Sequence, residues 1–487
     1  MSSTSASTPW VSDVAVSLRE AFTGPVPQDV LDRAAVQLLD MIACASGGFD
    51  SEPVRIARAV SEGSGPAQAS VLFTGDRVSV IDAILVNGTA ARFLDYNDAF
   101  IGTGPGGHPS DNLVAALAVA EVEGSSGRDL LTAAALGYEL FWRFRQSVYA
   151  RTEQAAAWDG VSVSSVVTAA MTGLLVGLDQ DRLMHALSIG LSKGYALKQL
   201  RRGSISMIKA SANALVARDG VLAARLAQHG LTGPTEILEG KSGVLRAFGL
   251  REEDSLRATL SAPPVWAIRN VSVKAYPAIA TSQAAIEAVV RLARRADVAV
   301  ESVAKIEVRL PDSKATREHL EIEQRQRPDS RESADHSLPF LLAAALEDGR
   351  LSLEQFAGER WRTPATTALM ERIQVIPDAS LVTTEQRSYP AVVTVELADG
   401  QRFTEAVTDV PGSPSAPWSF TEIETKFADT DRVGFSPAQR SALVAAAAAL
   451  PRAADVSELM TATAVLPRLP DRSASARLPA KGHDLYA

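Results

Sequence analysis

The residue pattern changes near residue 272 and again near residue 412, and this change constrains the fold most strongly. From residue 10 to about 270 the chain is a series of Ala- and Leu-rich runs with helical spacing, separated by Gly and Pro. From about 272 short β-branched runs such as VAKIEVRLP and RIQVIPD alternate with helical runs, and Asp399-Gly400 predicts a hairpin turn. The sequence therefore predicts a mainly α protein with a smaller α+β module.

The helical pattern returns after Pro411, through SPAQRSALVAAAAAL. We expect a helical domain in two parts, residues 10–271 and 412–465, with the α+β module of residues 272–411 inserted between them. Residues 466–487 are rich in Pro, Ser and Arg and are expected to be loosely ordered. The opening MSSTSASTPW has no basic start followed by an apolar core, so we interpret it as a frayed tail rather than a secretory signal.

Composition excludes several classes of protein. No uninterrupted apolar run is long enough for a transmembrane helix, so no membrane partner is expected. The single cysteine, Cys44, forbids an internal disulfide, fits a reducing cytoplasm and lies in an apolar run typical of a core. One thiol cannot hold an iron–sulfur cluster. The six histidines include no pair at metal-ligand spacing, so we expect no cofactor and no metal, although carboxylate-only metal sites stay open.

The segment FLDYNDAFIGTGPGGHPSDN, residues 93–112, joins two apolar helical runs and concentrates residues that transfer protons. Catalytic side chains often lie on loops held by a rigid scaffold. Asp95 and Asp98 are three residues apart and share one side of a helix if the preceding helix extends through FLDYND. His108 precedes Pro109, which favours an extended backbone just before the next helix. An acid pair beside an oriented imidazole suits general acid–base chemistry.

The same segment also has a purely structural interpretation. Ser110 or Asp111 can cap the helix that begins near LVAALAVAEVEG. Asp98 and Ser110 would then be helix caps, and His108 an ordinary loop residue. The segment therefore predicts either a proton-transfer site or a capped loop.

A second pattern is a run of cations without acids. No Asp or Glu lies between Asp181 and Asp219, although the whole chain carries a net charge of −9. Lys209 has no acid three or four residues away to pair with on its own helix. The seven cations in this run are Arg182, Lys193, Lys198, Arg201, Arg202, Lys209 and Arg218. They predict either a solvated basic face or a site for a small polycarboxylate. Nucleic acid is not expected, because the domain is not basic overall and lacks interleaved aromatics.

Seven collinear blocks resemble the MmgE/PrpD family. They are LLDMIACASGG, NGTAARFLDYND, GGHPSDN, SISMIKASANALVARDGVLAARLAQHGLTGP, EGKSGV, VKAYPA and RESADHSLPFLLAAALEDG. The resemblance runs from about residue 10 to about residue 450. It implies a mainly α fold with a large all-helical domain and a smaller α+β lid domain, a site in the cleft between them, and a homodimer. It also implies metal-independent acid–base chemistry.

The resemblance assigns roles to individual residues. Asp95 matches the family's catalytic-site aspartate, His108 its HPS histidine, and Lys209 and Lys274 its two active-site lysines. His336 lies in the family's DHS element, where capping the helix that follows is an equally good explanation. The residues expected to bind substrate around them are Asp98, Ser110, Arg201, Arg202 and Tyr276.

Three positions depart from the family's pattern. Ala99 stands where relatives carry Thr after the DYND motif, Gly160 where dehydratase-like members have the histidine of WDHV, and Ile279 where the decarboxylase branch has a histidine. Each departure removes a polar group from the expected surroundings of the substrate. Because losing a hydrogen bond to a charged group costs roughly 1.5–3 kcal/mol, the departures predict a substrate other than methylcitrate or cis-aconitate.

The expected activity is that of a cytoplasmic lyase of the dehydratase type. It would remove a proton from the carbon α to a carboxylate of a small polycarboxylic or related acid, and a β-hydroxyl would then leave. We assign His108 as the leading acid or base, Asp95 as its orienting partner or a second base, and Lys209 and Lys274 as electrostatic clamps. An epimerase or isomerase using the same proton abstraction is the alternative. A decarboxylase or a non-catalytic family member fits less well.

Overall fold

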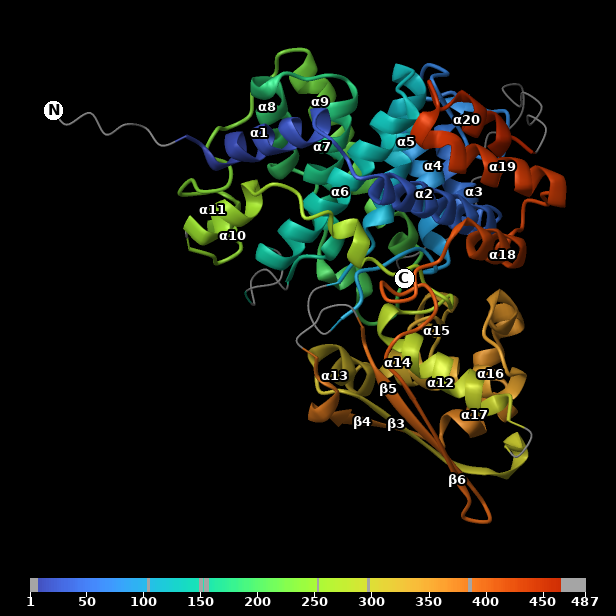
Figure 1. Cartoon of the computed structure of the whole chain (residues 1–487). Coiled ribbons are helices and arrows are strands. Elements are labelled where there is room, and N and C mark those ends of the chain that lie inside the picture. Colours follow the sequence, from blue (N-terminus) through green and yellow to red (C-terminus); the bar gives the residue numbers. More distant parts are fainter. Residues whose placement is uncertain are drawn as a thin grey trace, which may run out of the picture.

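A computed structural model describes residues 8–102, 106–148, 152, 157–251, 254–295, 298–383 and 388–465. Most helices gather in one large part, and the strands lie with the remaining helices in a smaller part below it in the view of Figure 1. This arrangement confirms the predicted mainly α fold with a smaller α+β part. The predicted tail at residues 466–487 lies outside the described residues, as do residues 1–7 of the N-terminal tail and residues 103–105 of the Gly-rich loop.

The helical part begins the chain. Its helices are α1 (Trp10–Thr23), α2 (Gln28–Gly48), α3 (Glu52–Ser61), α4 (Val80–Phe93), α5 (Leu113–Glu123), α6 (Gly127–Ser147), α7 (Ser164–Leu175), α8 (Gln180–Leu191), α9 (Ile208–Gln228), α10 (Val244–Ala247) and α11 (Asp254–Ser261). A short antiparallel pair, β1 (Ala69–Ser70) and β2 (Arg77–Val78), lies between α3 and α4. Within the described residues, no helix is both long and apolar enough to cross a membrane.

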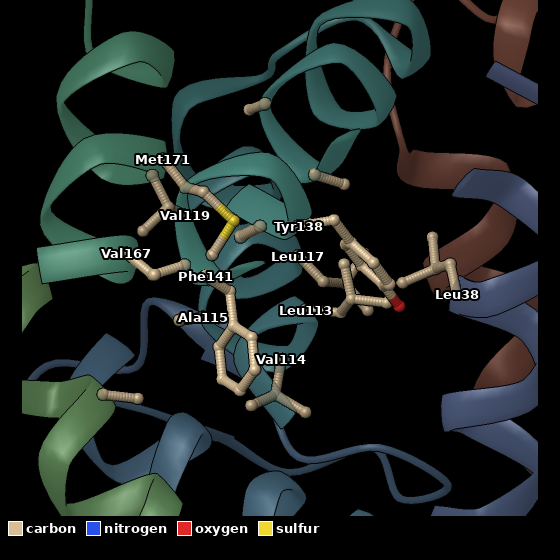
Figure 2. Close-up of a cluster of buried hydrophobic side chains, with 14 of the residues drawn as sticks. Leu38, Leu113, Val114, Ala115, Leu117, Val119, Tyr138, Phe141, Val167 and Met171 are labelled. Carbon is tan, nitrogen blue, oxygen red and sulfur yellow. The ribbon is translucent and has the colours of Figure 1, made fainter. Parts of the chain in front are cut away.

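The core of the helical part is built around α5. Every residue of α5 from Leu113 to Ala120 is buried, so this helix is apolar on all sides and packs against α4, α6 and α7. Side chains from α5, α6 and α7 interdigitate there (Figure 2). Gly137 lets α6 approach α7 closely, because a Cβ atom at this position would lie 2.5 Å from the sulfur of Met171. Cys44 is buried, as predicted for a core cysteine.

The α+β part contains a four-stranded sheet. Its elements are α12 (Gln283–Ala293), β3 (Val303–Pro311), α13 (Lys314–Glu321), α14 (Glu323–Gln326), α15 (Arg331–Ala334), α16 (Leu338–Asp348), α17 (Pro364–Met370), β4 (Ile373–Asp378), β5 (Ala391–Leu397) and β6 (Arg402–Val407). The strand order is β4-β3-β5-β6, with β3 parallel to β4 and antiparallel to β5. Alternate residues of β5 are buried, and α12 packs on β5 and β6. The predicted hairpin joins β5 to β6, with Gly400 at φ 86°.

The chain then returns to the helical part through α18 (Phe420–Thr430), α19 (Pro437–Ala449) and α20 (Ser457–Thr463). Figure 1 shows these last helices near α2 and α3, and α18 and α19 both pack on α2. The buried Lys426 of α18 places its Nζ 2.6 Å from Oδ1 of Asp40 in α2. The same ammonium donates to the backbone carbonyls of Tyr96 and Lys274. The domain boundaries given above stay a prediction.

Three chain segments meet where the helical and α+β parts join. Ala99 and Ser272 exchange backbone hydrogen bonds of 2.8 and 2.9 Å, and the amide of Val273 donates to the carbonyl of Gly412. Gly412 has φ 87°, and a Cβ there would lie 2.3 Å from the carbonyl oxygen of Val273, so only glycine fits. The polar residues 95–98 therefore lie next to the crossing of these three segments.

Candidate active site

A cavity of about 250 Å³ lies where the two parts meet. Residues 99–102 and 106–108 and helices of the large part form one side, and residues 279–281 and His336 of the α+β part belong to the other. Cations predominate among its charged lining residues, and both acids and imidazoles are present. The charged and imidazole residues of the lining are Arg92, Asp95, His108, Asp111, Arg145, Asp159, Lys198, Arg201, Arg202, Glu318, Arg325 and His336.

Asp95 is the most highly connected acid of the site. Because α4 ends at Phe93, Asp95 lies beyond the helix with φ 51°, a left-handed conformation that costs free energy for a residue other than glycine. Its Oδ1 lies 2.8 Å from Nη1 of Arg92 and 2.5 Å from Nζ of Lys274. Burial raises the pKa of Asp95, but Arg92, Lys274 and Lys209 together hold it well below the usual value. The carboxylate is therefore ionised at neutral pH.

Lys209 connects the two parts of the molecule. From α9 its Nζ reaches Oδ1 of Asp335 at 2.8 Å, and it lies 3.4 Å from Oδ2 of Asp95. Burial raises the pKa of Asp335, but Lys209 and His336 bring it to about 2. Burial also lowers the pKa of Lys209, against the two carboxylates that raise it. Lys209 thus pairs with an acid that is distant in sequence. Neither Lys209 nor Lys274 lines the cavity.

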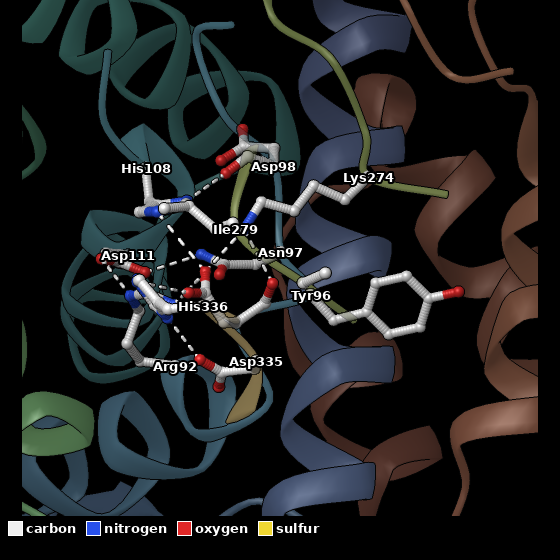
Figure 3. Close-up of polar contacts among 12 residues, drawn as sticks. Arg92, Tyr96, Asn97, Asp98, His108, Asp111, Lys274, Ile279, Asp335 and His336 are labelled. Atoms are coloured by element: carbon white, nitrogen blue, oxygen red, sulfur yellow. Dashed lines mark hydrogen bonds and ion pairs between the residues drawn. The ribbon is translucent and has the colours of Figure 1, made fainter. Parts of the chain in front are cut away.

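His108 presents one ring nitrogen to the cavity. Its Nδ1 lies 2.7 Å from the backbone carbonyl of Asp98, which can only accept, so Nδ1 carries the proton (Figure 3). Nε2 then has a free lone pair and lies 3.6 Å from Oδ1 of Asp95, longer than a direct hydrogen bond. Burial, together with Arg92 and Lys274, holds the pKa of His108 well below its usual value. The imidazole is neutral and able to accept a proton.

His336 supplies a second imidazole from the α+β part. Its Nδ1 forms a short hydrogen bond with the carboxylate of Asp335, and its Nε2 lies 3.6 Å from Oδ2 of Asp95. Burial and the neighbouring Lys209 lower the pKa of His336 to about 4. The N-cap of α16 is Ser337, whose side chain accepts the amide of Phe340, so His336 is not the cap. The imidazoles of His108 and His336 converge on one carboxylate from opposite sides of the junction.

Asp98 and Ser110 lie behind His108 rather than in the cavity. Asp98 is fully buried; its side chain accepts hydrogen bonds from the amide of Ser110 and from the hydroxyl of Tyr138 at 2.6 Å. Asp95 and Asp98 therefore do not form the acid pair that an extended helix would have given. The predicted capping by Ser110 or Asp111 is also wrong: a 3₁₀ turn at Pro109–Asn112 precedes α5, and neither side chain caps that helix.

The two arginines predicted to bind substrate do line the cavity. Nε of Arg201 lies 2.7 Å from Oδ2 of Asp159, and Nη2 of Arg202 lies 3.0 Å from Oε1 of Glu318. Tyr276 does not line the cavity. Its hydroxyl donates a hydrogen bond to the carboxylate of Glu287. Its role as a substrate ligand stays a prediction.

Several residues of the site were not singled out from the sequence. Arg92 lies three residues before Asp95, a helical spacing that could have revealed the pair. Asp335 precedes His336 directly, so the DHS element contains both. Asp111, considered from the sequence only as a helix cap, is buried beside Arg92 and accepts a hydrogen bond from Asn97. Arg145 and Arg325 carry no local sequence signal for a role in the cavity.

All three positions that depart from the family pattern line the cavity. Ala99, Gly160 and Ile279 are all lining residues, and Figure 3 shows Ile279 near the cluster of polar side chains around Asp335 and His336. The differences therefore lie where a bound molecule would be recognised.

Comparison with protein families agrees with this architecture. The MmgE/PrpD N-terminal domain matches residues 14–256, and the MmgE/PrpD C-terminal domain matches residues 276–450. These matches cover most of the chain, and the protein belongs to the MmgE/PrpD family. The resemblance noted from the seven sequence blocks is thereby confirmed.

Curated relatives are distant but similar over most of their length. The chain is 25% identical to a cis-aconitate decarboxylase of Aspergillus terreus, over 82% of this chain and 83% of the relative. It is 26% identical to 2-methylcitrate dehydratase of Salmonella typhimurium, over 71% and 74% of the two chains. An alkylcitrate dehydratase of Fungal sp. is 27% identical over 83% of this chain and 84% of its own.

The buried Asp98 generates a prediction about stability. Burial raises the pKa of Asp98 to about 7, against the hydrogen bonds from Ser110 and Tyr138 that lower it. A carboxyl whose pKa is raised by folding stabilises the protein fully below its unfolded pKa of about 3.9, and this contribution is lost as pH rises through about 7. Melting temperatures of the wild type and Asp98→Asn from pH 5 to pH 8 should therefore show the wild type losing stability relative to the variant. A difference that does not change with pH would contradict the protonation of Asp98.

Proposed function

We propose that this protein is a metal-independent lyase of the dehydratase type, acting on a small polycarboxylic or related acid. The observation that carries the proposal is His108, a neutral imidazole fixed at Nδ1 by the Asp98 carbonyl, with Nε2 facing Asp95 at the edge of a cation-lined cavity. The names of the relatives, dehydratases and decarboxylases, support a lyase.

The first step is removal of a proton from the carbon α to a substrate carboxylate. Nε2 of His108 accepts this proton, and the imidazolium that forms is stabilised by the carboxylate of Asp95, 3.6 Å away. The negative charge that develops on the substrate is stabilised by Arg92, with Lys274 and Lys209 contributing positive potential from beneath the cavity. The lysines therefore act through the charge network and not as direct substrate ligands.

The second step expels the β-hydroxyl as water. The carbanion electrons form the new carbon–carbon double bond, and the leaving oxygen takes back the proton that His108 removed, from the His108 imidazolium. His336 faces the same cavity from the α+β part, but its pKa of about 4 keeps it neutral, so His108 serves first as the base and then as the acid. One proton and one hydroxide leave the substrate as water, and His108 returns to its starting charge.

An epimerase is the second candidate, and one observation favours it. His108 and His336 approach the cavity from opposite parts of the molecule, which suits removal of a proton by one imidazole and delivery of a proton taken from solvent by the other on the opposite face. Epimerisation needs no further acid for a leaving group. The loss of side-chain polarity at Ala99, Gly160 and Ile279 is compatible with such a reaction.

Metal independence rests on the cations around the acids. Asp95, Asp335 and His336 form a group that could hold a metal ion, the only one found among the described residues. The carboxylate oxygens of this group already contact Arg92, Lys274 and Lys209. A divalent cation there would lie against the ammonium groups of two lysines, so like-charge repulsion disfavours it.

We also propose that the protein forms a homodimer through one face of α9. The most exposed positions of this helix are Ile208, Leu215 and Leu222, which are 39%, 39% and 46% exposed, all apolar and spaced by seven residues. Ile208 and Leu215 also line a surface groove of about 560 Å³, whose lining is mainly apolar and includes Leu197 and Leu200. A surface patch that combines exposed apolar side chains with a groove can be self-complementary, as a two-fold interface requires.

Charges on the same face specify a register. Arg218 and Asp219 lie between Leu215 and Leu222 and have opposite signs. A two-fold axis through the midpoint of this pair, with the helices antiparallel, places Leu215 opposite the partner's Leu222. It also places Arg218 opposite the partner's Asp219, so both copies gain a charge pair at the edge of the apolar stripe.

The reaction can be tested by incubating protein dialysed against EDTA with a panel of hydroxy- and amino-polycarboxylates in D₂O. We expect an alkene product with unchanged turnover after dialysis. Deuterium incorporation without an alkene would instead identify the epimerase. Turnover lost on dialysis and restored by a divalent metal would contradict metal independence, and no reaction with any acid of the panel would contradict the proposed activity.

Replacing the proposed base tests its role. His108→Gln keeps a polar side chain but removes the titrating group, so turnover should fall by roughly two to four powers of ten. His229→Gln is the matched control, because His229 is exposed at the end of α9 and does not line the cavity. Near-normal turnover of His108→Gln in steady-state assays would shift the role of base to His336.

The register of the dimer can be tested by charge reversal and sedimentation. Arg218→Asp should weaken the dimer, because it places two acids opposite each other, and Arg218→Asp combined with Asp219→Arg should restore it. Leu222→Glu should yield a monomer with a melting temperature within a few degrees of the wild type. A monomeric wild type at micromolar concentration would contradict the homodimer, and a double variant no better than Arg218→Asp would contradict the register.

A further inference from the structure

The cavity contains a lysine that the proposed mechanism does not use. Lys198 lies at the start of the 3₁₀ helix of residues Lys198–Arg201 and lines the cavity. Lys209 and Lys274 each contact the carboxylate of Asp95. The ammonium of Lys198, by contrast, makes no hydrogen bond or ion pair with any residue in the described parts of the chain. It is thus a cation of the cavity that has no protein partner there.

The neighbours of Lys198 make the surrounding region positive. The cations here outnumber the acids, and the acids are already engaged: Asp159 pairs with Arg201 at 2.7 Å, and Glu318 contacts Arg202 and Arg325 at 3.0 and 3.2 Å. Burial and the nearby Arg201 lower the pKa of Lys198 to about 8, although Asp159 raises it. A partly buried ammonium beside other cations is stabilised when an anion binds between them.

Arg145 shares this region with Lys198. It extends from α6, donates from Nε to the carbonyl of Gly106 at 2.9 Å, and lines the cavity. Its guanidinium lies against Gly160, where a Cβ atom would be 3.2 Å from Cζ and 3.4 Å from both terminal nitrogens. The lack of a side chain at Gly160 therefore leaves the space that the guanidinium of Arg145 takes.

Backbone pairing holds this arrangement in place. The amide of Asp159 donates to the carbonyl of Ala196 at 2.8 Å, and Trp158 forms a β-bridge with Leu197. The residues just before Gly160 and just before Lys198 are therefore paired directly. Lys198 follows one of these paired segments, and the guanidinium of Arg145 from α6 lies against Gly160, which follows the other. Two cations held in one region by such pairing form a preorganised anion site.

We propose that Lys198, together with Arg145 beside Gly160, binds a remote carboxylate of the substrate, distinct from the carboxylate next to the carbon that His108 deprotonates. This inference rests on the proposed function for the identity of the ligand. The substrate class becomes an acid with at least two carboxylates, one near Arg92 and one between Lys198 and Arg145. A substrate with a neutral remote group would leave the ammonium of Lys198 without an anion.

The test measures binding and not turnover, so that it stands apart from the reaction itself. Isothermal titration with succinate, citrate, propionate and inorganic phosphate compares a dicarboxylate and a tricarboxylate with a monocarboxylate and with another anion. The wild type should bind a dicarboxylate more tightly than propionate or phosphate. In Lys198→Gln that affinity should fall about tenfold or more, to the level of propionate, because one charge-assisted contact is lost.

Matched variants separate the site from general charge. Lys193→Gln removes an exposed lysine of the same cation run and should bind dicarboxylates like the wild type. Lys198→Arg should retain binding above pH 8, where binding by the wild type weakens as Lys198 loses its charge. His108→Gln should lose turnover yet keep the affinity, so failure of the proposed reaction leaves this result intact.

Four outcomes would overturn the inference. They are unchanged succinate affinity in Lys198→Gln, an equal loss in Lys193→Gln, tighter binding of phosphate than of succinate or citrate, and a wild type that binds neither succinate nor citrate. Gly160→Ala gives an independent check. Its methyl group crowds Arg145 and should weaken dicarboxylate binding while propionate binding stays unchanged.

Discussion

The charge network around Asp95 is the interaction on which the rest of the site depends. Arg92 from α4, Lys274 from the start of the α+β part and Lys209 from α9 all contact one carboxylate that is almost fully buried. Removing one member of a buried ionic group leaves the others unpaired, at a cost of roughly 3–5 kcal/mol. Because Lys209 also holds Asp335, the same network ties the helical part to the segment that carries His336. The same charge network therefore attaches the two parts of the molecule to each other and positions both imidazoles.

The backbone of Asp95 shows how closely this position is specified. Its left-handed conformation favours Gly, Asn and Asp among the amino acids, and only Asp supplies the negative charge that three cations require. Local geometry and long-range electrostatics therefore select the same residue independently.

Much of the fold could be predicted from local patterns. Helical spacing in the first 270 residues and the alternating runs of β3, β5 and β6 correspond to the observed elements, because burial on one face enforces those periods. The end of α4 was less predictable. FLDYND could continue a helix by its spacing, but α4 stops at Phe93 and Asp95 turns to meet cations that are distant in sequence.

Site residues could be predicted where the reactive side chains lie in one segment of the sequence. Those that depend on tertiary contacts could not. Asp95, His108 and the cation run stand out by type and spacing. The partner of Lys209 could not be found in this way, since Asp335 lies 126 residues away and helical spacing says nothing about it. Lys198 could likewise not be distinguished from Arg201 and Arg202 by sequence, because all three are cations in one run. Only the structure shows that the two arginines already pair with acids.

The return of the chain to α2 has a consequence for synthesis. Thr430 of α18 hydrogen-bonds to the carbonyl of Ala43, 387 residues earlier, and Lys426 neutralises the buried Asp40. At ribosomal rates of about 5–20 residues per second, roughly 20–80 s pass between the synthesis of α2 and that of the residues of α18 that pack on it. During that interval the nascent helices expose an uncompensated acid and an apolar face, while the whole α+β part is being made. The helical part can therefore complete its packing on α2 only after α18 has been made, and α2 is the segment that a holding chaperone could bind for the longest time.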